Sequence, residues 1–169
     1  MKCRIGDRIL YGALGVMEIV DIVSEGSFDN QKTYYVLKDI YSSAHAKTYV
    51  PTDNERLSMQ MYPLLDKNQL LLLLDGAGAA CTSVWSENNR ERMEEYRAVM
   101  ESGDRTALIS LIKSVEQMGR MRSEIGKKNY ISDEDAKRRA LRLLSLEAAT
   151  VLSIPLDEAE SLIKGKILT

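Results

Sequence analysis

Histidine, cysteine, phenylalanine and tryptophan are scarce in this chain, and these scarcities exclude several classes of protein. Among 169 residues there are one histidine (His45), two cysteines (Cys3 and Cys81), one phenylalanine and one tryptophan. Three residues cannot supply all the ligands of a zinc site built only from histidine and cysteine. Two cysteines cannot form the framework of a disulfide-rich secreted domain. We therefore expect no metal site of this kind.

The chain also has neither a strong net charge nor a long apolar run. It carries 23 basic and 25 acidic residues, a formal net charge of −2, which excludes a protein that is basic all over its surface. No apolar run approaches the roughly 20 residues of a membrane-spanning helix, and the first residues do not resemble a signal peptide. Hydrophobic residues make up 44%, enough for a core. We expect a soluble cytoplasmic protein with reduced thiols and no membrane partner.

The pattern of residues 1–62 is typical of β structure. Short runs that alternate or are rich in β-branched residues follow one another without an intervening helix, which predicts a small antiparallel barrel or strongly bent sheet. The expected strands are residues 8–11, 16–23, 33–37, 48–50 and 56–61.

From residue 63 onwards the apolar spacing is helical. The leucine run 70–74 predicts a short buried helix that ends in a flexible loop at residues 76–78. Ser86 and Ser132 have the sequence context of N-caps, for helices that end near Met100 and Leu152. Further amphipathic helices are expected around residues 107–115 and after Pro155. The predicted fold is α+β with two modules, residues 1–62 and 63–169.

Motifs of enzymes are absent from the sequence. There is no Gly-x-x-x-x-Gly-Lys phosphate loop, and the loop at residues 76–78 has no lysine partner. Cys81 has no base near it in sequence, and His45 is expected on a surface turn. We therefore expect a binding protein without catalytic residues, cofactor or small-molecule substrate.

Two features call for a functional explanation. Trp85 precedes a predicted helix; it is either an apolar anchor for that helix or an exposed ring that contacts a nucleobase. Residues 113–142 contain nine basic and five acidic residues, an excess of four positive charges in a chain of net charge −2. This segment is either an ordinary mixed-charge surface or a patch that contacts phosphates.

Several motifs, taken in their order and spacing, resemble the CarD/CdnL family of bacterial transcription regulators. They are Ile5–Tyr11 with Gly15-Val16, Tyr34–Leu37, Tyr49–Pro51, Trp85-Ser86 with Arg90 and Arg92, Ile131-Ser132, and Glu147–Ala149. The chain departs from the family pattern at Gly12, Leu14 and Tyr49, where proline, histidine, and arginine or methionine are usual.

The resemblance implies that the first module is Tudor-like and docks on the β subunit of RNA polymerase by strand addition, through Lys47, Tyr49, Val50 and Pro51. It implies that the helical module contacts promoter DNA at the upstream edge of the bubble, with little sequence specificity, and that Trp85 is a minor-groove wedge. The basic residues that would hold phosphates are Arg90, Arg122, Lys127, Lys128, Lys137, Arg138, Arg139 and Arg142. The implied function is stabilisation of the open promoter complex.

Two alternatives stay open at this point. The chain could be a protein adapter that docks on RNA polymerase without direct DNA contact. It could also use Tyr34, Tyr35 and Tyr49 as an aromatic cage for a cation. Because adjacent strand residues point to opposite faces, Tyr34 and Tyr35 are not expected to line one cage together.

Overall fold

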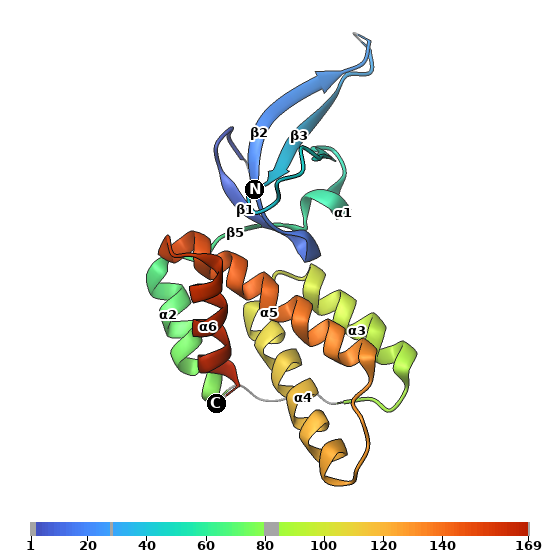
Figure 1. The fold of residues 1–169 in the computed structure, drawn as a ribbon. Coiled ribbons are helices and arrows are strands. Elements are labelled where there is room, and N and C mark those ends of the chain that lie inside the picture. Colours follow the sequence, from blue (N-terminus) through green and yellow to red (C-terminus); the bar gives the residue numbers. More distant parts are fainter. Residues whose placement is uncertain (1–2, 28, 80–84, 169) are drawn as a thin grey trace. The chain divides into compact units, whose positions relative to one another are not determined.

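The computed structural model describes residues 3–27, 29–79 and 85–168, and the chain divides into two compact units, residues 1–64 and 65–169. The first unit is mainly a β-sheet, and every regular element among the described residues of the second is a helix (Figure 1). The boundary lies two residues beyond the one predicted. Within the described ranges, no helix has the length and apolarity needed to cross a bilayer.

The first unit is built on one five-stranded antiparallel sheet with the order β4-β3-β2-β1-β5. Its strands are β1 (Arg8–Tyr11), β2 (Gly15–Glu25), β3 (Lys32–Asp39), β4 (Lys47–Pro51) and β5 (Met61–Pro63). The sheet is open, with β4 and β5 as its two edges, so the structure has antiparallel β order in this unit but not a closed barrel. The long β2–β3 hairpin extends beyond the shorter strands (Figure 1).

One face of the sheet holds the apolar core of the first unit. Alternate residues of the strands meet there, as the two-residue period of a strand requires. Tyr35 of β3 is paired with Val50 of β4 in the sheet. Tyr35 also packs against the buried residues of the core. The buried members of the cluster are Cys3, Ile9, Tyr11, Met17, Ile19, Leu37, Val50 and Met61.

The predicted fifth strand at residues 56–61 is wrong for most of its length. Residues Glu55–Ser58 form a short helix, α1, and only Met61–Pro63 pair with β1. The Asn54 side chain accepts a hydrogen bond from the Leu57 amide at 3.2 Å, which caps the helix. The alternating pattern spans only six residues, and the Asn54 cap favours a helix over a strand at its start.

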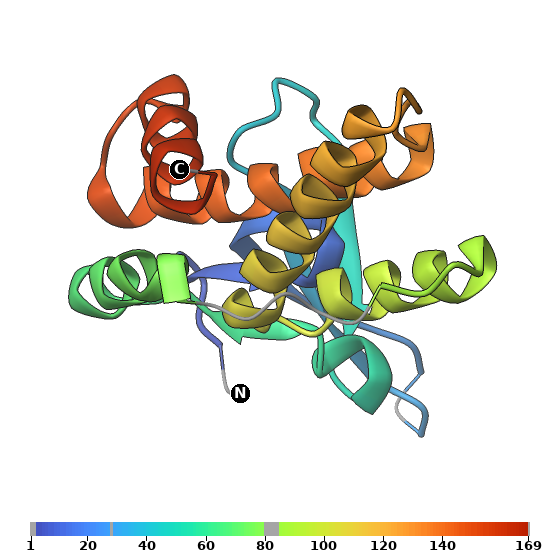
Figure 2. The ribbon, with the colours of Figure 1, turned by 90° about the horizontal axis from the view of Figure 1, so that it is seen from below.

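The second unit is a bundle of five α-helices. They are α2 (Lys67–Gly76), α3 (Asn89–Glu101), α4 (Arg105–Glu124), α5 (Ile131–Leu152) and α6 (Leu156–Ile167). α5 is the longest and packs against the other four. α2 and α6 lie towards one end of the unit and α3 towards the other, with α4 between them (Figure 1; Figure 2). α5 also carries the longest row of buried residues, from Ala140 to Ala149 with one exposed position.

The predicted N-caps of two helices are each wrong by two residues. Asn88, not Ser86, caps α3, and its side chain accepts from the Arg90 amide at 3.0 Å. The Ser86 hydroxyl instead accepts from the Asn88 amide. Ser132 lies inside the first turn of α5, which begins at Ile131 without a side-chain cap. Ser86 and Ser132 are therefore near the helix starts but do not form the caps.

The leucine run is helical, as predicted, but it is not buried throughout. Only Leu70 and Leu74 of α2 are buried, while Leu71 and Leu72 are exposed. The spacing of four between the buried pair is that of one helix face. The predicted loop at residues 76–78 is also wrong, because α2 continues to Gly76 and a 3-10 turn follows at Ala77–Ala79. Cys81 lies outside the described residues.

Candidate functional site

Trp85 is half-buried and lies against two side chains from distant parts of the helical unit. Its ring stacks on that of Tyr130, with centroids 6.3 Å apart and planes 20° from parallel. The guanidinium of Arg92, in α3, lies 4.3 Å from the Trp85 centroid and 5.0 Å from that of Tyr130. Cation–π contacts of this length are favourable, the more so away from water. Trp85 is thus part of an ordered cluster rather than a freely exposed ring.

Arg92 is the centre of this cluster and is only 1% exposed. Its Nε and Nη2 both donate to the Asp133 carboxylate of α5 at 3.3 Å. Its Nη1 donates to the carbonyl oxygens of Ser86 and Glu87 at 2.9 and 3.1 Å. Because a buried guanidinium needs partners for its donors, these bonds fix the backbone that immediately follows Trp85. We call Trp85, Arg92, Tyr130 and Asp133 the Arg92 cluster.

Tyr96, one helical turn beyond Arg92, carries a perturbed hydroxyl. Burial, reinforced by the negative charge of Asp133, raises the pKa of Tyr96 to about 12 against the opposing effects of Arg92 and Trp85. The Tyr96 hydroxyl and the Trp85 Nε1 are both buried, and neither has a hydrogen-bond partner among the described residues. Two buried polar atoms beside Arg92 are therefore without a partner among the described residues.

The turn between α4 and α5 brings Tyr130 to the cluster. Arg122, near the end of α4, places its guanidinium 4.1 Å from the Tyr130 centroid and donates from Nε to the Lys128 carbonyl at 3.0 Å. The Asn129 side chain donates to the Glu134 carboxylate at 2.6 Å. These contacts order a turn that the sequence alone showed only as a glycine- and lysine-containing break.

The predicted phosphate-contacting residues differ in how far acidic neighbours neutralise them. Lys127, Lys128 and Arg142 are exposed and have no acidic partner within the described parts of the chain. Arg138 and Arg139 share the Asp135 carboxylate, and exposed Arg90 pairs with Glu94 at 3.2 Å. Exposed pairs of this kind are weak and do not hold a side chain firmly.

Lys137 is the most constrained of the predicted phosphate contacts. Its Nζ lies 3.0 Å from Glu116 and 2.8 Å from Glu134, and its side chain is mostly buried. Burial alone would lower the pKa of Lys137, but the hydrogen bonds and charges of the two glutamates outweigh it and raise this pKa. Burial would likewise raise the pKa of Glu116, but Lys137 and Arg120 lower it. Lys137 therefore links α4 to α5 within the unit.

The predicted polymerase-binding residues Lys47, Tyr49, Val50 and Pro51 all lie on edge strand β4. Val50 is 0% exposed and points into the core, whereas Tyr49 is 53% exposed. The Thr52 amide donates to the Thr33 carbonyl of β3 at 2.9 Å. Because amides of successive strand residues point to opposite sides, the Tyr49 amide is on the free edge, where Pro51 has no N–H to offer.

The three tyrosines considered as an aromatic cage do not converge. Tyr35 packs against the apolar core, on the face opposite to its neighbour Tyr34. Tyr34 and Tyr49 line a shallow hollow of about 310 Å³ with Glu25. Two partly exposed rings and one carboxylate leave this hollow open on the remaining sides.

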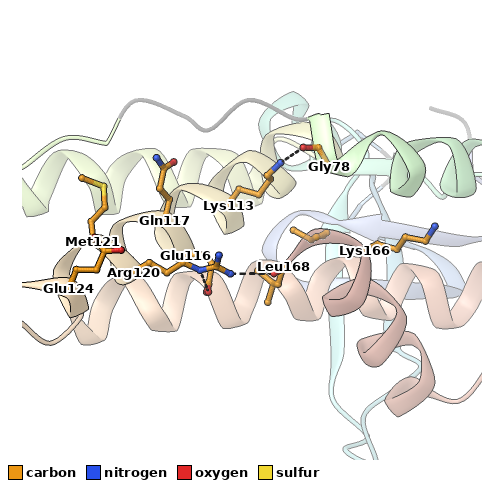
Figure 3. A pocket seen from close by; sticks show the side chains of 10 residues that line it. Gly78, Lys113, Glu116, Gln117, Arg120, Met121, Glu124, Lys166 and Leu168 are labelled. Atoms are coloured by element: carbon orange, nitrogen blue, oxygen red, sulfur yellow. Dashed lines mark hydrogen bonds and ion pairs between the residues drawn. The ribbon is translucent and has the colours of Figure 1, made fainter.

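A hollow of about 450 Å³ lies along α4 beside the end of α6 (Figure 3). Two of its cationic side chains are engaged within the protein: Lys113 donates to the carbonyls of Ala77 and Gly78, and Arg120 donates to Glu116 and to the Leu168 carbonyl. Among the described residues no group of histidine, cysteine, aspartate or glutamate side chains could hold a metal ion. This hollow therefore offers few free groups for a ligand.

Sequence reasoning missed Tyr130 and Asp133 as members of the Arg92 cluster. Asp133 lies in the first turn of α5, where an acidic residue favours the helix dipole. More than forty residues separate Trp85 from both, and no periodic pattern connects positions so far apart. The only local signal is that Tyr130 is a large aromatic residue directly before a predicted helix.

No protein-family model matches this chain, and no curated protein matches it at a significant level. The resemblance to the CarD/CdnL family thus rests on the sequence motifs.

Proposed function

We propose that this protein is a transcription regulator that binds the β subunit of RNA polymerase through its β unit and promoter DNA through its helical unit. In this proposal the β unit is a Tudor-like module, and the helical unit contacts DNA at the upstream edge of the bubble. The protein stabilises the open complex and performs no covalent chemistry. The motif resemblance to CarD/CdnL proteins supplies the partners.

The observation that carries the proposal is the Arg92 cluster and its basic surroundings. An indole and a phenol ring are held in a fixed stack by a buried guanidinium. Exposed Lys127 and Lys128 precede Tyr130 in the same turn, without acidic partners among the described residues. Aromatic faces beside exposed cations suit a ligand that combines bases with phosphates.

The free edge of β4 supports the polymerase half of the proposal. Strand addition needs an unpaired edge whose N–H and C=O groups face outwards, with side chains that can be read on one face. Tyr49 offers both an outward amide and an exposed side chain, while Val50 anchors the strand to the core. Pro51 ends the strand, which limits the length that a partner strand can pair with.

The mechanism is differential binding. Contacts made only with melted promoter DNA shift the closed–open equilibrium towards the open complex. A preference of about 1.4 kcal/mol changes the population ratio about tenfold. A protein that reaches DNA while bound to polymerase therefore needs only modest DNA affinity of its own, which agrees with its net charge of −2.

The test is the lifetime of the open complex after challenge with a competitor, with and without the protein. We expect wild type to lengthen this lifetime and Trp85→Ala to lose the effect while retaining binding to polymerase. Trp85→Phe, which keeps an aromatic ring against Arg92, should retain part of the effect. An unchanged lifetime with wild-type protein, at saturating binding to polymerase, would contradict the proposal.

The adapter alternative is favoured by one observation, the internal neutralisation of basic residues on α5. Lys137, Arg138 and Arg139 all have acidic partners within the helical unit. If the helical unit docks on protein, footprinting of the promoter–polymerase complex will show no new protection at the upstream bubble edge. New protection there, weakened by added salt, supports direct DNA contact.

A further inference from the structure

The turn between α4 and α5 exposes apolar and basic side chains together. We call residues 122–131 the α4–α5 tip. Ile131 is 88% exposed, and Ile125 and Tyr130 are also exposed. The tip carries three basic residues, Arg122, Lys127 and Lys128, against one acidic residue, Glu124. Solvent exposure of this much apolar surface beside uncompensated cations indicates a binding surface.

The tip is ordered before any partner binds. Gly126, at φ +72°, takes the left-handed conformation that ends α4, and the Lys127 amide donates to the Arg122 carbonyl at 2.8 Å. A Cβ on Gly119 would lie 2.5 Å from Asn129 Nδ2, so this glycine provides the space for Asn129. Such pre-organisation reduces the entropy lost on binding.

Tyr130, rather than Trp85, is the ring that the tip presents. Tyr130 is 42% exposed, whereas Trp85 is half-buried and its Nε1 is buried. Arg122 contacts the Tyr130 ring, and Trp85 with Arg92 supports it from within the unit. Tyr130 is the more exposed of the two rings because it lies in the turn between α4 and α5, whereas Trp85 lies against the buried Arg92 side chain.

We propose that Tyr130 stacks on an unpaired base at a duplex–single-strand junction, in the position that the Arg122 guanidinium takes on the ring in the free protein, that Lys127 and Lys128 contact the adjacent phosphates, and that Trp85 positions Tyr130. This inference rests on the proposed function for its DNA partner and assigns the contacting ring to a different residue. Aromatic stacking on bases is sequence-tolerant, and lysines supply salt-dependent phosphate affinity.

The chemistry of the tip favours nucleic acid over an anionic membrane. Binding in the plane of a membrane typically uses a helix whose apolar face continues over several turns. The exposed apolar groups here lie instead around one short turn, with a planar ring held flat against a second ring and a guanidinium. A planar aromatic ring can stack on a nucleobase, which is also planar, whereas a lipid tail has no planar group to stack on it.

The experiment uses the full chain and a short forked DNA whose first unpaired base is 2-aminopurine, with binding and base fluorescence measured at several salt concentrations. We expect wild type and Tyr130→Phe to bind the fork and to quench the 2-aminopurine. Tyr130→Leu keeps apolar bulk without the ring, and we expect it to bind at least about fivefold more weakly and to lose the quenching.

A double variant, Lys127→Gln with Lys128→Gln, tests the phosphate contacts. It should weaken binding and reduce the slope of log affinity against log salt by roughly one per lysine. The matched control, Lys67→Gln with Lys164→Gln, makes the same change in net charge on α2 and α6 and should leave the slope unchanged. Circular dichroism checks that each variant is folded.

Three outcomes would overturn the inference. They are no binding of the fork by wild type, equal affinity and quenching for Tyr130→Leu and wild type, and binding to phosphatidylglycerol vesicles in preference to the fork. The open-complex lifetime separates these failures from failure of the proposed function. If wild type lengthens that lifetime and Tyr130→Leu does so equally, the proposed function stands and the assignment of Tyr130 is wrong.

Discussion

Arg92 of α3 and Asp133 of α5, 41 positions apart in sequence, form an ion pair at 3.3 Å with both side chains almost completely buried. The pair joins the start of α3 to the start of α5 and holds the backbone after Trp85. A buried ion pair is costly to desolvate, so its main consequence is geometric specificity. It determines where Trp85 and Tyr130 meet.

Removal of one partner of this pair is expected to destabilise the helical unit strongly. Asp133→Ala leaves the Arg92 guanidinium buried without its counter-charge, and we expect a loss of about 3–5 kcal/mol in the free energy of unfolding. Urea denaturation followed by Trp85 fluorescence measures this directly, because Trp85 is the only tryptophan.

The control for Asp133→Ala is Arg90→Gln, which breaks the exposed pair with Glu94 one turn away. It should change stability by no more than about 0.5 kcal/mol. The double variant Arg92→Met with Asp133→Ala should lose less than the sum of the single losses. A small loss for Asp133→Ala, similar to that of the control, would show that the pair does not fix the cluster.

Tyr96 gives a pH dependence in the alkaline range. Its folded-state pKa is raised to about 12 from an ordinary value of 10.0, so the folded state binds more protons than the unfolded state between these values. The contribution of Tyr96 is therefore fully present below pH 10 and is lost as the pH rises towards 12. We expect Tyr96→Phe to abolish this part of the stability loss.

The measurement for Tyr96 is urea denaturation of wild type and Tyr96→Phe at neutral pH and at several values above pH 10. At neutral pH the two should be nearly equal, or the variant slightly more stable, because the Tyr96 hydroxyl is buried without a hydrogen-bond partner among the described residues. Parallel stability curves for the two proteins above pH 10 would contradict the prediction.

Gly119 is expected to reverse the usual effect of a glycine-to-alanine substitution in a helix. Alanine is favoured by about 1 kcal/mol in helix propensity. At Gly119 its Cβ would displace the Asn129 side chain and break the hydrogen bond to the Glu134 carboxylate, which contributes about 1.5–3 kcal/mol. We therefore expect Gly119→Ala to lower the free energy of unfolding by roughly 1 kcal/mol.

Two comparisons isolate that contact. Gly165→Ala in α6, where an added Cβ meets nothing within 4 Å, should be neutral or stabilising. With Asn129→Ala already present, Gly119→Ala should become stabilising, because the side chain that it displaces is gone. If Gly119→Ala stabilises the wild-type protein as Gly165→Ala does, the close approach of Asn129 is unimportant.

The free edge of β4 can be tested with a backbone substitution. Tyr49→Pro removes the outward amide, a change that an edge strand tolerates on its free side. Loss of one inter-strand hydrogen bond should weaken binding to RNA polymerase roughly two- to tenfold. Tyr49→Ser removes the side chain but keeps the amide and should bind more tightly than Tyr49→Pro. Equal affinities for the two variants would argue against strand addition.

The positions of most helices and strands follow from local pattern. The first four strands, the amphipathic helices after Gly103 and the division into a β part and an α part were predictable, because each depends on periodicity within one segment. The errors occurred where that signal is short or is shared with a local hydrogen bond. Asn54 capped a helix in place of a strand, and Asn88 capped α3 in place of Ser86.

The residues of the candidate sites likewise differ in whether local sequence or helix packing determines their surroundings. Tyr49 and Val50 could be placed on an edge strand from strand length and the following proline. The neutralisation of Lys137 by Glu116 could not be foreseen, because it depends on how α4 and α5 pack.

Sequence alone established a near-neutral, histidine-poor chain with a β part, a helical part, a lone tryptophan and a local excess of basic residues. Tertiary structure decided which of those residues meet. It placed Asp133 on Arg92, and Tyr130 on Trp85. Helix periodicity specifies which face of a helix is apolar, but contacts between residues more than forty positions apart arise only when the faces of several helices pack together.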